Sequence, residues 1–186
     1  PTPILDGVSF SLEENDRLGI IGVNGCGKST LFRLISGAME PDEGSYKWGI
    51  STSRSYFPHD NSEFFEGHDE SILDWMRVWS KDQTETYLRG FLGRMLFSNE
   101  SVFKPVRVLS GGEKVRCMFS RMMLFGSNVL ILDQPTDHLD LESITAVNNG
   151  LSNFKGNVLF SCHDFEMVST VANRIIRIKD GKILDF

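Results

Sequence analysis

The sequence predicts an α/β fold in which helices cover a mainly parallel β-sheet. Short apolar runs of strand length alternate along its 186 residues with segments whose apolar residues recur at helical spacing. This alternation is typical of parallel strands, because each crossover between them needs a long connection such as a helix. A glycine-rich stretch at 22–30, placed between a predicted strand and a predicted helix, is the second observation that favours this fold.

In the first sixty residues the patterns predict four strands and one helix. Residues 8–12 and 46–48 alternate apolar with polar side chains, and we expect them to be half-buried strands in an antiparallel β part near the N-terminus. The run 17–21 suits a buried parallel strand, and a further strand ends at residues 56–57. Apolar residues at helical spacing over 31–35 predict a helix directly after the glycine-rich stretch.

Beyond residue 65 the pattern becomes helical, and we expect a helical subdomain at about 65–124. After it come, in order, a wholly apolar strand at 129–132, a helix at 141–151, a strand at 158–160, a helix at 165–171 and two closing strands at 175–178 and 183–184. The chain is therefore expected to form one domain over residues 1–186, with its core at about 1–60 and 125–186.

Composition and charge narrow the classes of protein to which the chain can belong. Hydrophobic residues make up 40% and charged residues 24%, as in a globular domain. The net charge of −6 argues against binding nucleic acid through the overall field of the chain. We expect no transmembrane span, because the apolar runs are only strand-length, and no secretory signal. The three scattered cysteines favour free thiols in the cytoplasm over disulfides or a zinc site.

The stretch Gly22-Val23-Asn24-Gly25-Cys26-Gly27-Lys28-Ser29-Thr30 matches the P-loop pattern G-x-x-x-x-G-K-[S/T] without a mismatch. Its glycines let the loop wrap so that backbone N–H groups point at phosphate oxygens, and the dipole of the following helix adds positive charge. Lys28 offers a mobile charge for the β- and γ-phosphates, and the Ser29 hydroxyl can bind Mg²⁺. The stretch therefore predicts a site for a triphosphate and Mg²⁺.

Three further groups fit the same chemistry. Asp133 ends the apolar strand 129–132, and because the C-terminal ends of parallel strands face the ligand crevice, this carboxylate can hold Mg²⁺ beside the loop. Ser110-Gly111-Gly112 precedes a helix and offers a second anion site, although the same residues read alone describe a capped turn. His163 follows another strand and can donate a hydrogen bond to the γ-phosphate region, although a strand-end histidine alone is more often structural.

Together these motifs resemble the ATP-binding cassette (ABC) ATPase domain over nearly the whole chain. In sequence order stand the P-loop at 22–30, the signature Leu109-Ser110-Gly111-Gly112-Glu113, the Walker B strand 129–133, the D-loop His138-Leu139-Asp140 and the switch histidine His163. The string at 135–140 resembles that of soluble ABC-F proteins more than that of transporter subunits. By this resemblance the chain looks like the second cassette of an ABC-F protein.

The resemblance implies ATP and Mg²⁺ as ligands and ATP hydrolysis as the activity. It also implies that two cassettes close head to tail around two ATP molecules, so that the signature of one cassette serves the nucleotide bound by the other. ABC-F proteins have no membrane domain and act on translating ribosomes, so the ribosome is the expected partner of the full-length protein. The family's adenine-stacking residue and inter-cassette linker are expected outside this chain. The alternative is the ATPase subunit of an ABC transporter.

The chain departs from the family at three positions near these motifs. Gln134 follows Asp133 where the family has a glutamate that polarises the attacking water. Because an amide can orient water but does not accept its proton at neutral pH, we expect ATP binding with slow hydrolysis, as in an ATP-gated clamp. The glutamine is either natural or a change that traps the ATP-bound state. His59 stands at the position of the Q-loop glutamine, and Asp137 stands where asparagine is usual.

Overall fold

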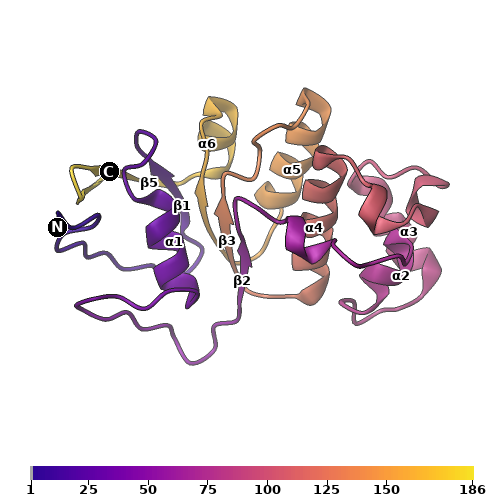
Figure 1. Ribbon diagram of the computed structural model, residues 1–186, viewed down its shortest axis with the longest axis horizontal. Coiled ribbons are helices and arrows are strands. Elements are labelled where there is room, and N and C mark those ends of the chain that lie inside the picture. Colours follow the sequence, from indigo (N-terminus) through magenta and orange to yellow (C-terminus); the bar gives the residue numbers. More distant parts are fainter. Residues whose placement is uncertain (1) are drawn as a thin grey trace. The chain divides into compact units, whose positions relative to one another are not determined.

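The computed structural model describes residues 2–186 and confirms the predicted α/β fold (Figure 1). Within these residues six strands form one sheet in the order β2-β3-β4-β1-β5-β6, in which β5 and β6 pair antiparallel and all other neighbours pair parallel. The strands are β1 Arg17–Ile21, β2 Arg54–Phe57, β3 Val129–Asp133, β4 Asn157–Ser161, β5 Arg174–Lys179 and β6 Lys182–Asp185. The C-terminal ends of β2, β3, β4 and β1 therefore share one edge of the sheet.

Six α-helices accompany the strands in the described part of the chain. They are α1 Lys28–Ser36, α2 Ile72–Arg77, α3 Glu85–Arg94, α4 Gly111–Phe125, α5 Leu141–Ser152 and α6 Phe165–Val171, and short 3₁₀ turns lie at Ser62–Phe64, Ser101–Phe103 and Val106–Val108. Helix α1 ends where Gly37 adopts the left-handed conformation with φ 85°, as its glycine predicts. None of the helices within residues 2–186 has both the length and the apolar character that crossing a membrane requires.

The chain divides into two compact units. The first comprises the chain up to His59 together with Ser127–Pro135 and Phe154–Phe186, and it contains the sheet, α1 and α6. The second comprises Asp60–Gly126 and Thr136–Asn153, and it contains α2, α3, α4 and α5. The P-loop stretch and Asp133 thus belong to the first unit, and the signature and the D-loop belong to the second.

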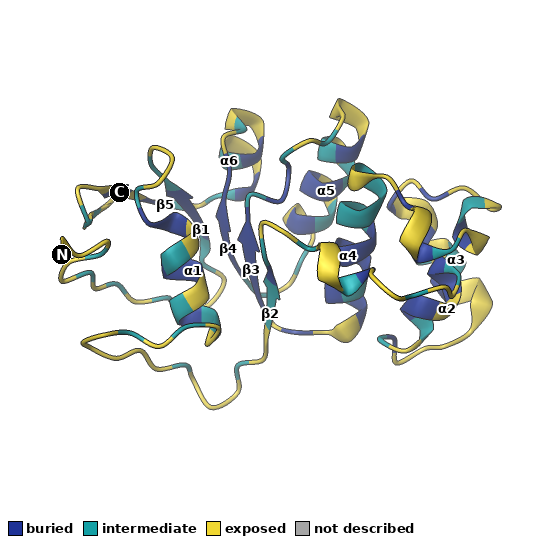
Figure 2. Ribbon diagram, viewed as in Figure 1, coloured by how far each residue is buried: buried dark blue, intermediate teal, exposed yellow. Residues whose placement is uncertain are grey.

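One face of the sheet packs against α1. The apolar residues of this cluster are Leu18, Ile20, Leu31, Phe32, Ile35, Val129, Ile131, Leu159, Ile176 and Ile178. Because strand side chains alternate between faces, Asp133 shares the face of Ile131, two residues before it. Ser161 pairs with Asp133 on one side and with Ile20 on the other, so it lies on this face too. Figure 2 shows that β3 and β4, which carry these two polar residues, are buried, β3 along its whole length and β4 after its first residue.

The predicted strands at 8–12 and 46–48 are wrong, because neither segment forms a strand in the described chain. Their alternation reflects contact with the core and not pairing in a sheet. Phe10 and Trp48 pack against the α1 cluster, and the Trp48 indole donates a hydrogen bond of 2.9 Å to the Ile35 carbonyl. The antiparallel pairing lies instead at the C-terminal end, where β5 turns into β6 through Asp180 and Gly181, both at positive φ.

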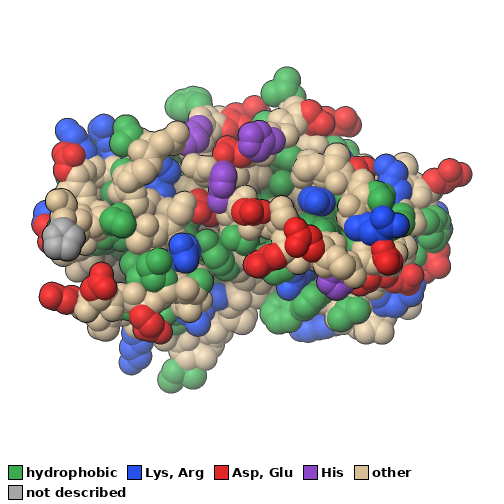
Figure 3. Space-filling model, viewed as in Figure 1, with side chains coloured by type: hydrophobic (Ala, Val, Ile, Leu, Met, Phe, Trp, Pro, Cys, Tyr) green, Lys and Arg blue, Asp and Glu red, His purple; other side chains and the backbone are tan. Residues whose placement is uncertain are grey.

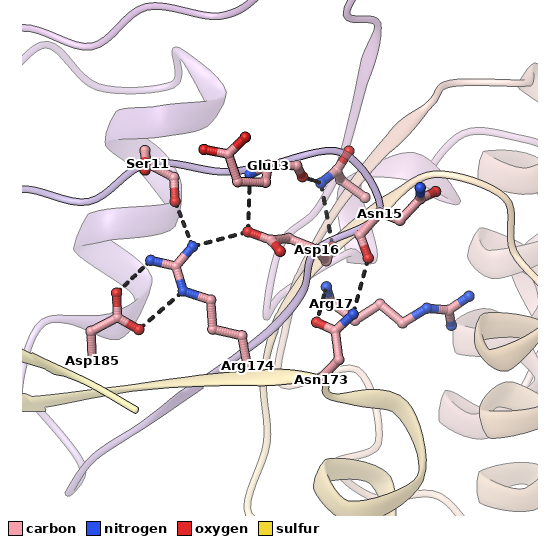
Figure 4. Close-up of polar contacts among 9 residues, drawn as sticks. Ser11, Glu13, Asn15, Asp16, Arg17, Asn173, Arg174 and Asp185 are labelled. Carbon is pink, nitrogen blue, oxygen red and sulfur yellow. Dashed lines mark hydrogen bonds and ion pairs between the residues drawn. The ribbon is translucent and has the colours of Figure 1, made fainter.

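A cluster of polar groups fastens the segment before β1, and strand β6, to the start of β5 (Figure 4). The Arg174 guanidinium donates to the Ser11 carbonyl at 2.6 Å, to Asp16 Oδ2 at 2.9 Å and to Asp185 Oδ1 at 3.0 Å. The preceding residue, Asn173, accepts a hydrogen bond of 2.8 Å from the first backbone N–H of β1. These bonds fix the point from which β1 runs toward the P-loop stretch.

Charged side chains of both signs are interspersed on the face shown in Figure 3. Ion pairs form along two helices, where Arg77 contacts Asp74 at 2.6 Å and Arg89 contacts Glu85 at 3.0 Å.

Candidate functional site

The P-loop stretch connects β1 to α1 in a conformation that depends on glycine. Gly22, Gly25 and Gly27 have φ of 157°, 78° and 108°, values that L side chains rarely adopt. At Gly22 there is also no room, because an added Cβ would lie 2.5 Å from Cys26 Sγ and 2.7 Å from the Ile178 carbonyl oxygen. The glycines of the motif therefore set the shape of the loop.

Lys28 is held inside this loop. Its side chain is 5% exposed, and its ammonium group donates to the carbonyl oxygens of Gly22 at 2.7 Å and Val23 at 2.9 Å. Its third contact is a long one of 3.9 Å to Cys26 Sγ, a weak acceptor that a phosphate oxygen can replace. A buried cation whose partners in the described chain are two carbonyl oxygens and a sulfur, and no carboxylate, also favours the approach of an anion.

The start of α1 adds donors to the same place. Gly27 is the N-cap residue and offers no side chain, so no side-chain bond caps the first N–H groups of the helix. These groups carry the positive end of the helix dipole. Ser29, in the first turn, is exposed, so its hydroxyl is accessible. Loop, lysine and helix terminus together form a site suited to phosphate groups.

Asp133 provides a buried carboxylate at the C-terminal end of β3, on the face covered by α1. It is 1% exposed, and its Oδ1 accepts a hydrogen bond of 3.0 Å from the Ser161 hydroxyl. The carboxylate and the Ser29 hydroxyl are oxygen donors of the kind that Mg²⁺ prefers. Within residues 2–186 no group of three or more His, Cys, Asp or Glu residues could hold a metal ion. Two oxygen donors of this kind fit Mg²⁺, because this ion keeps several waters and is bound through one or two carboxylates together with substrate phosphates.

Tyr56 is a neighbour of this carboxylate that the sequence did not single out. Burial and the charge of Asp133 together raise the pKa of Tyr56 to about 12, against a smaller opposing effect of Arg33. Tyr56 pairs with Ile131 across β2 and β3, so it lies on the face of Asp133. The register of two strands distant in sequence brings the phenol and the carboxylate together.

Gln134 and His163, both predicted as catalytic, lie together in the structure. Gln134 Nε2 is 3.3 Å from His163 Nε2. The backbone of Gln134 turns sharply after β3 with φ 50°, and its N–H donates to both the carbonyl and the hydroxyl oxygen of Ser161, each at 3.1 Å. The two side chains thus meet just beyond the ends of β3 and β4.

His59, at the predicted Q-loop position, lies two residues beyond the end of β2 and is exposed. Strand β2 is the neighbour of β3, so His59 follows a strand end at the same sheet edge as Asp133. His59 therefore follows the strand end expected from the sequence. From the Q-loop position we predict that a ring nitrogen of His59 reaches Mg²⁺ or the attacking water.

In the second unit, the signature Leu109–Glu113 begins α4 with a capping box. The Ser110 hydroxyl accepts from the Glu113 N–H at 3.2 Å, and Glu113 Oε2 accepts from the Ser110 N–H at 2.9 Å. Burial would raise the pKa of Glu113, but the hydrogen bond from Ser110 and the ammonium of Lys104 outweigh it and lower this pKa. An added Cβ at Gly111 would meet nothing within 4 Å, so a ligand could approach the backbone there.

The D-loop residues lie beside the signature in the same unit. His138 has φ 66°, and a turn from Leu139 N–H to the Thr136 carbonyl at 3.2 Å leads into α5. Asp140 caps α5 by accepting a 2.7 Å bond from the Ser143 N–H, and this bond lowers the pKa of Asp140. Leu139 Cδ2 lies 3.5 Å from a Cβ placed on Gly112, so the two predicted motifs adjoin.

Comparison with known proteins supports the resemblance to ABC ATPase domains that the sequence motifs indicate. The family model described as ABC transporter matches residues 5–137. A dimeric ATP-binding cassette, solved in a post-hydrolysis state with ADP and phosphate, has a TM-score of 0.81 over 98% of this chain and 90% of that chain. Its sequence identity is 19%, so this likeness concerns the fold alone.

Curated relatives match the chain along almost all of its length. The ABC transporter ATP-binding protein YkpA of Bacillus subtilis is 58% identical over 98% of the chain, which covers 34% of YkpA. The energy-dependent translational throttle protein EttA of Escherichia coli is 36% identical over 97% of the chain and 33% of EttA. ABC transporter F family member 5 of Arabidopsis thaliana is 33% identical over 96% of the chain and 26% of that protein. The chain thus spans about a third or less of these relatives.

Proposed function

The chain belongs to the ABC transporter family, and from that premise we propose that it is one Mg-ATP-binding cassette of an ABC-F type protein. The observation that carries the proposal is the Lys28 ammonium, buried within a glycine-shaped loop and held there by two carbonyl oxygens and a longer contact to the Cys26 sulfur, with no carboxylate among these partners. A second support is the Asp133 carboxylate, which lies on the sheet face covered by the helix that Lys28 begins.

Each residue of the site has a distinct role in this proposal. The backbone N–H groups of Gly22–Thr30 bind the phosphates, and Lys28 neutralises their charge. Ser29 and Asp133 hold Mg²⁺, which when bound would neutralise charge on the β- and γ-phosphates. His163 donates to the γ-phosphate, and Gln134 orients the attacking water. His59, after β2, contributes from the Q-loop position.

The signature acts on a different nucleotide. Ser110, Gly111 and Gly112 present the start of α4 to ATP bound by a second cassette, so the two close head to tail around both nucleotides. The open space above Gly111 supports this role, because a phosphate can approach the backbone there. The second cassette is either part of the same full-length chain or a second copy.

Hydrolysis in this cassette is slow, because Gln134 replaces the family's glutamate. The amide donates toward His163 and accepts no proton from water at neutral pH. ATP therefore closes the two cassettes and is hydrolysed slowly, so the ATP-bound, closed state of the cassettes persists.

Ribosome association of the full-length protein is supported by its relatives. One carries the name energy-dependent translational throttle protein and another is an F-family member. The alternative, an ATPase subunit of a membrane transporter, is favoured by the description of the matching family. Sedimentation of the full-length protein in the presence of ATP distinguishes the two functions. Sedimentation with ribosomes would support the ABC-F function, and sedimentation with membranes would support the transporter subunit.

Calorimetry tests ATP binding by this chain directly. Lys28→Ala should abolish the heat of Mg-ATP binding seen for the unaltered chain. Lys155→Ala, which removes an exposed lysine elsewhere in the first unit, is the matched control and should bind as the unaltered chain does. Equal binding by the two variants, or none by the unaltered chain, would contradict the proposal.

A further inference from the structure

Ser161 is a buried polar residue at the C-terminal end of β4 that the roles above do not use. It is 0% exposed, and on its face of the sheet it lies between Asp133 on β3 and Ile20 on β1. The preceding residue on the same face, Leu159, is aliphatic and belongs to the α1 cluster. A hydroxyl in such a place is tolerated only when it is hydrogen-bonded.

The hydrogen bonds of Ser161 join two residues of the proposed site. Its hydroxyl donates to Asp133 Oδ1 at 3.0 Å and accepts from the Gln134 N–H at 3.1 Å. A hydroxyl has one proton, and the carboxylate is the partner that can only accept, so the direction of both bonds is fixed. One side chain therefore determines where the metal-binding carboxylate sits and how the chain turns after it.

The Asp133 carboxylate makes no other hydrogen bond within residues 2–186. Its Oδ1 is bound to Ser161, which leaves Oδ2 for a metal ion. Without the hydroxyl, this carboxylate would lose its only hydrogen bond at a buried site and would be free to rotate about its terminal torsion. The N–H of Gln134 would keep only the Ser161 carbonyl as its acceptor.

We propose that Ser161 is a positioning residue that orients Asp133 toward Mg²⁺ and holds the turn at Gln134. The inference rests on the proposed function of the site. A positioning role of Ser161 differs from a merely structural role in one measurable effect. Loss of a hydroxyl whose hydrogen bonds only stabilise the buried core should lower stability and leave ligand affinity unchanged. Loss of a hydroxyl that orients a metal ligand should weaken the binding of Mg-ATP more than the binding of metal-free ATP.

The test compares Ser161→Ala with Ser120→Ala. Ser120 is also 0% exposed, and its hydroxyl donates to the Arg116 carbonyl at 2.9 Å within α4 of the second unit. Calorimetry measures binding of ATP with Mg²⁺ and with EDTA, and urea unfolding measures stability. We expect Ser161→Ala to weaken Mg-ATP binding about 10–100-fold, the usual effect of removing a residue that orients a metal ligand. Binding with EDTA should change less than about twofold on the same reasoning. Ser120→Ala should change neither affinity.

Ser161→Thr and Ser161→Val form a second, nearly isosteric pair that differs by the hydroxyl alone. Threonine should restore the Mg²⁺-dependent affinity and valine should not, even if both destabilise the chain. Equal losses of affinity with Mg²⁺ and with EDTA, or equal behaviour of threonine and valine, would overturn the inference alone. Absence of binding by the unaltered chain under both conditions would overturn the proposed function and the inference with it.

Discussion

Replacing Gln134 by glutamate should restore a general base to the site without moving it. The backbone at this position is held by two hydrogen bonds from its N–H to Ser161, and glutamate has the same length and shape as glutamine. The new carboxylate would lie beside His163, where the amide now lies 3.3 Å from the imidazole. The substitution therefore changes the chemistry at a fixed location.

The size of the effect follows from that geometry. A positioned base contributes about 10²–10⁴ in rate, or about 3–5 kcal/mol at ~1.4 kcal/mol per tenfold. A hydrogen bond from His163 would reduce the basicity of the carboxylate, which favours the lower end of this range. We expect Gln134→Glu to raise turnover at least tenfold and by about 10².

The assay is release of phosphate over time at saturating Mg-ATP, with the affinity for Mg-ATP measured in parallel. Gln134→Ala is the control, because it removes the amide without supplying a base, and its turnover should stay at or below that of the unaltered chain. If Gln134→Glu binds ATP normally and its turnover rises less than twofold, this residue is not at the position of the base. Rapid release by the unaltered chain would refute the reasoning as well.

Three further predictions concern the loop and the signature helix. Gly22→Ala should weaken Mg-ATP binding at least tenfold, since its Cβ would lie 2.5 Å from Cys26 Sγ, whereas Gly90→Ala, with nothing within 4 Å, should bind normally; calorimetry of both checks this. Ser110→Ala should lower stability to urea by about 1 kcal/mol through loss of the α4 cap, and equal midpoints would contradict this role. The lowered pKa of Glu113 stabilises the fold above its unfolded pKa near 4.5, and this contribution is lost as pH falls through the folded pKa. The stability advantage over Glu113→Gln should therefore shrink in urea titrations below about pH 4.5.

The sequence predicted those parts of the site that depend on neighbours along the chain. The P-loop glycines, the buried strand that ends at Asp133 and the cap at Ser110 are local patterns, and the structure contains each of them. The prediction of a strand at 46–48 was wrong because alternating apolar residues indicate only that one side of the segment is buried. Trp48 is partly buried against the core although its segment pairs with no strand in the described chain. Alternation alone does not distinguish these two arrangements.

The residues missed by the sequence are those whose partners lie across the sheet. Tyr56 and Ser161 flank Asp133 because three strands distant in sequence take one register, and no local pattern encodes that register. Their only signal is a polar group at a core-facing position of a buried strand, which must find a partner. For Ser161 that partner is Asp133 at the paired position of β3, whereas Tyr56 pairs with Ile131 and shares only the sheet face with Asp133.

Strand β4 contacts both Asp133 and Gln134, because side chains alternate between the two faces along each strand and paired residues share a face. Asp133 and Ser161 are the last residues of two paired strands, so their side chains share a face, while His163 lies two residues further along the chain from Ser161. Gln134 leaves the extended path with φ 50°, and its N–H is bound by β4, which directs its side chain to His163. The Asp133 carboxylate and the Gln134 amide, to which we assign metal binding and orientation of water, are thus both positioned against β4. A substitution that displaces the end of β4 should therefore impair Mg²⁺ binding and hydrolysis together, whereas His163→Ala should slow hydrolysis and leave Mg²⁺ binding unchanged.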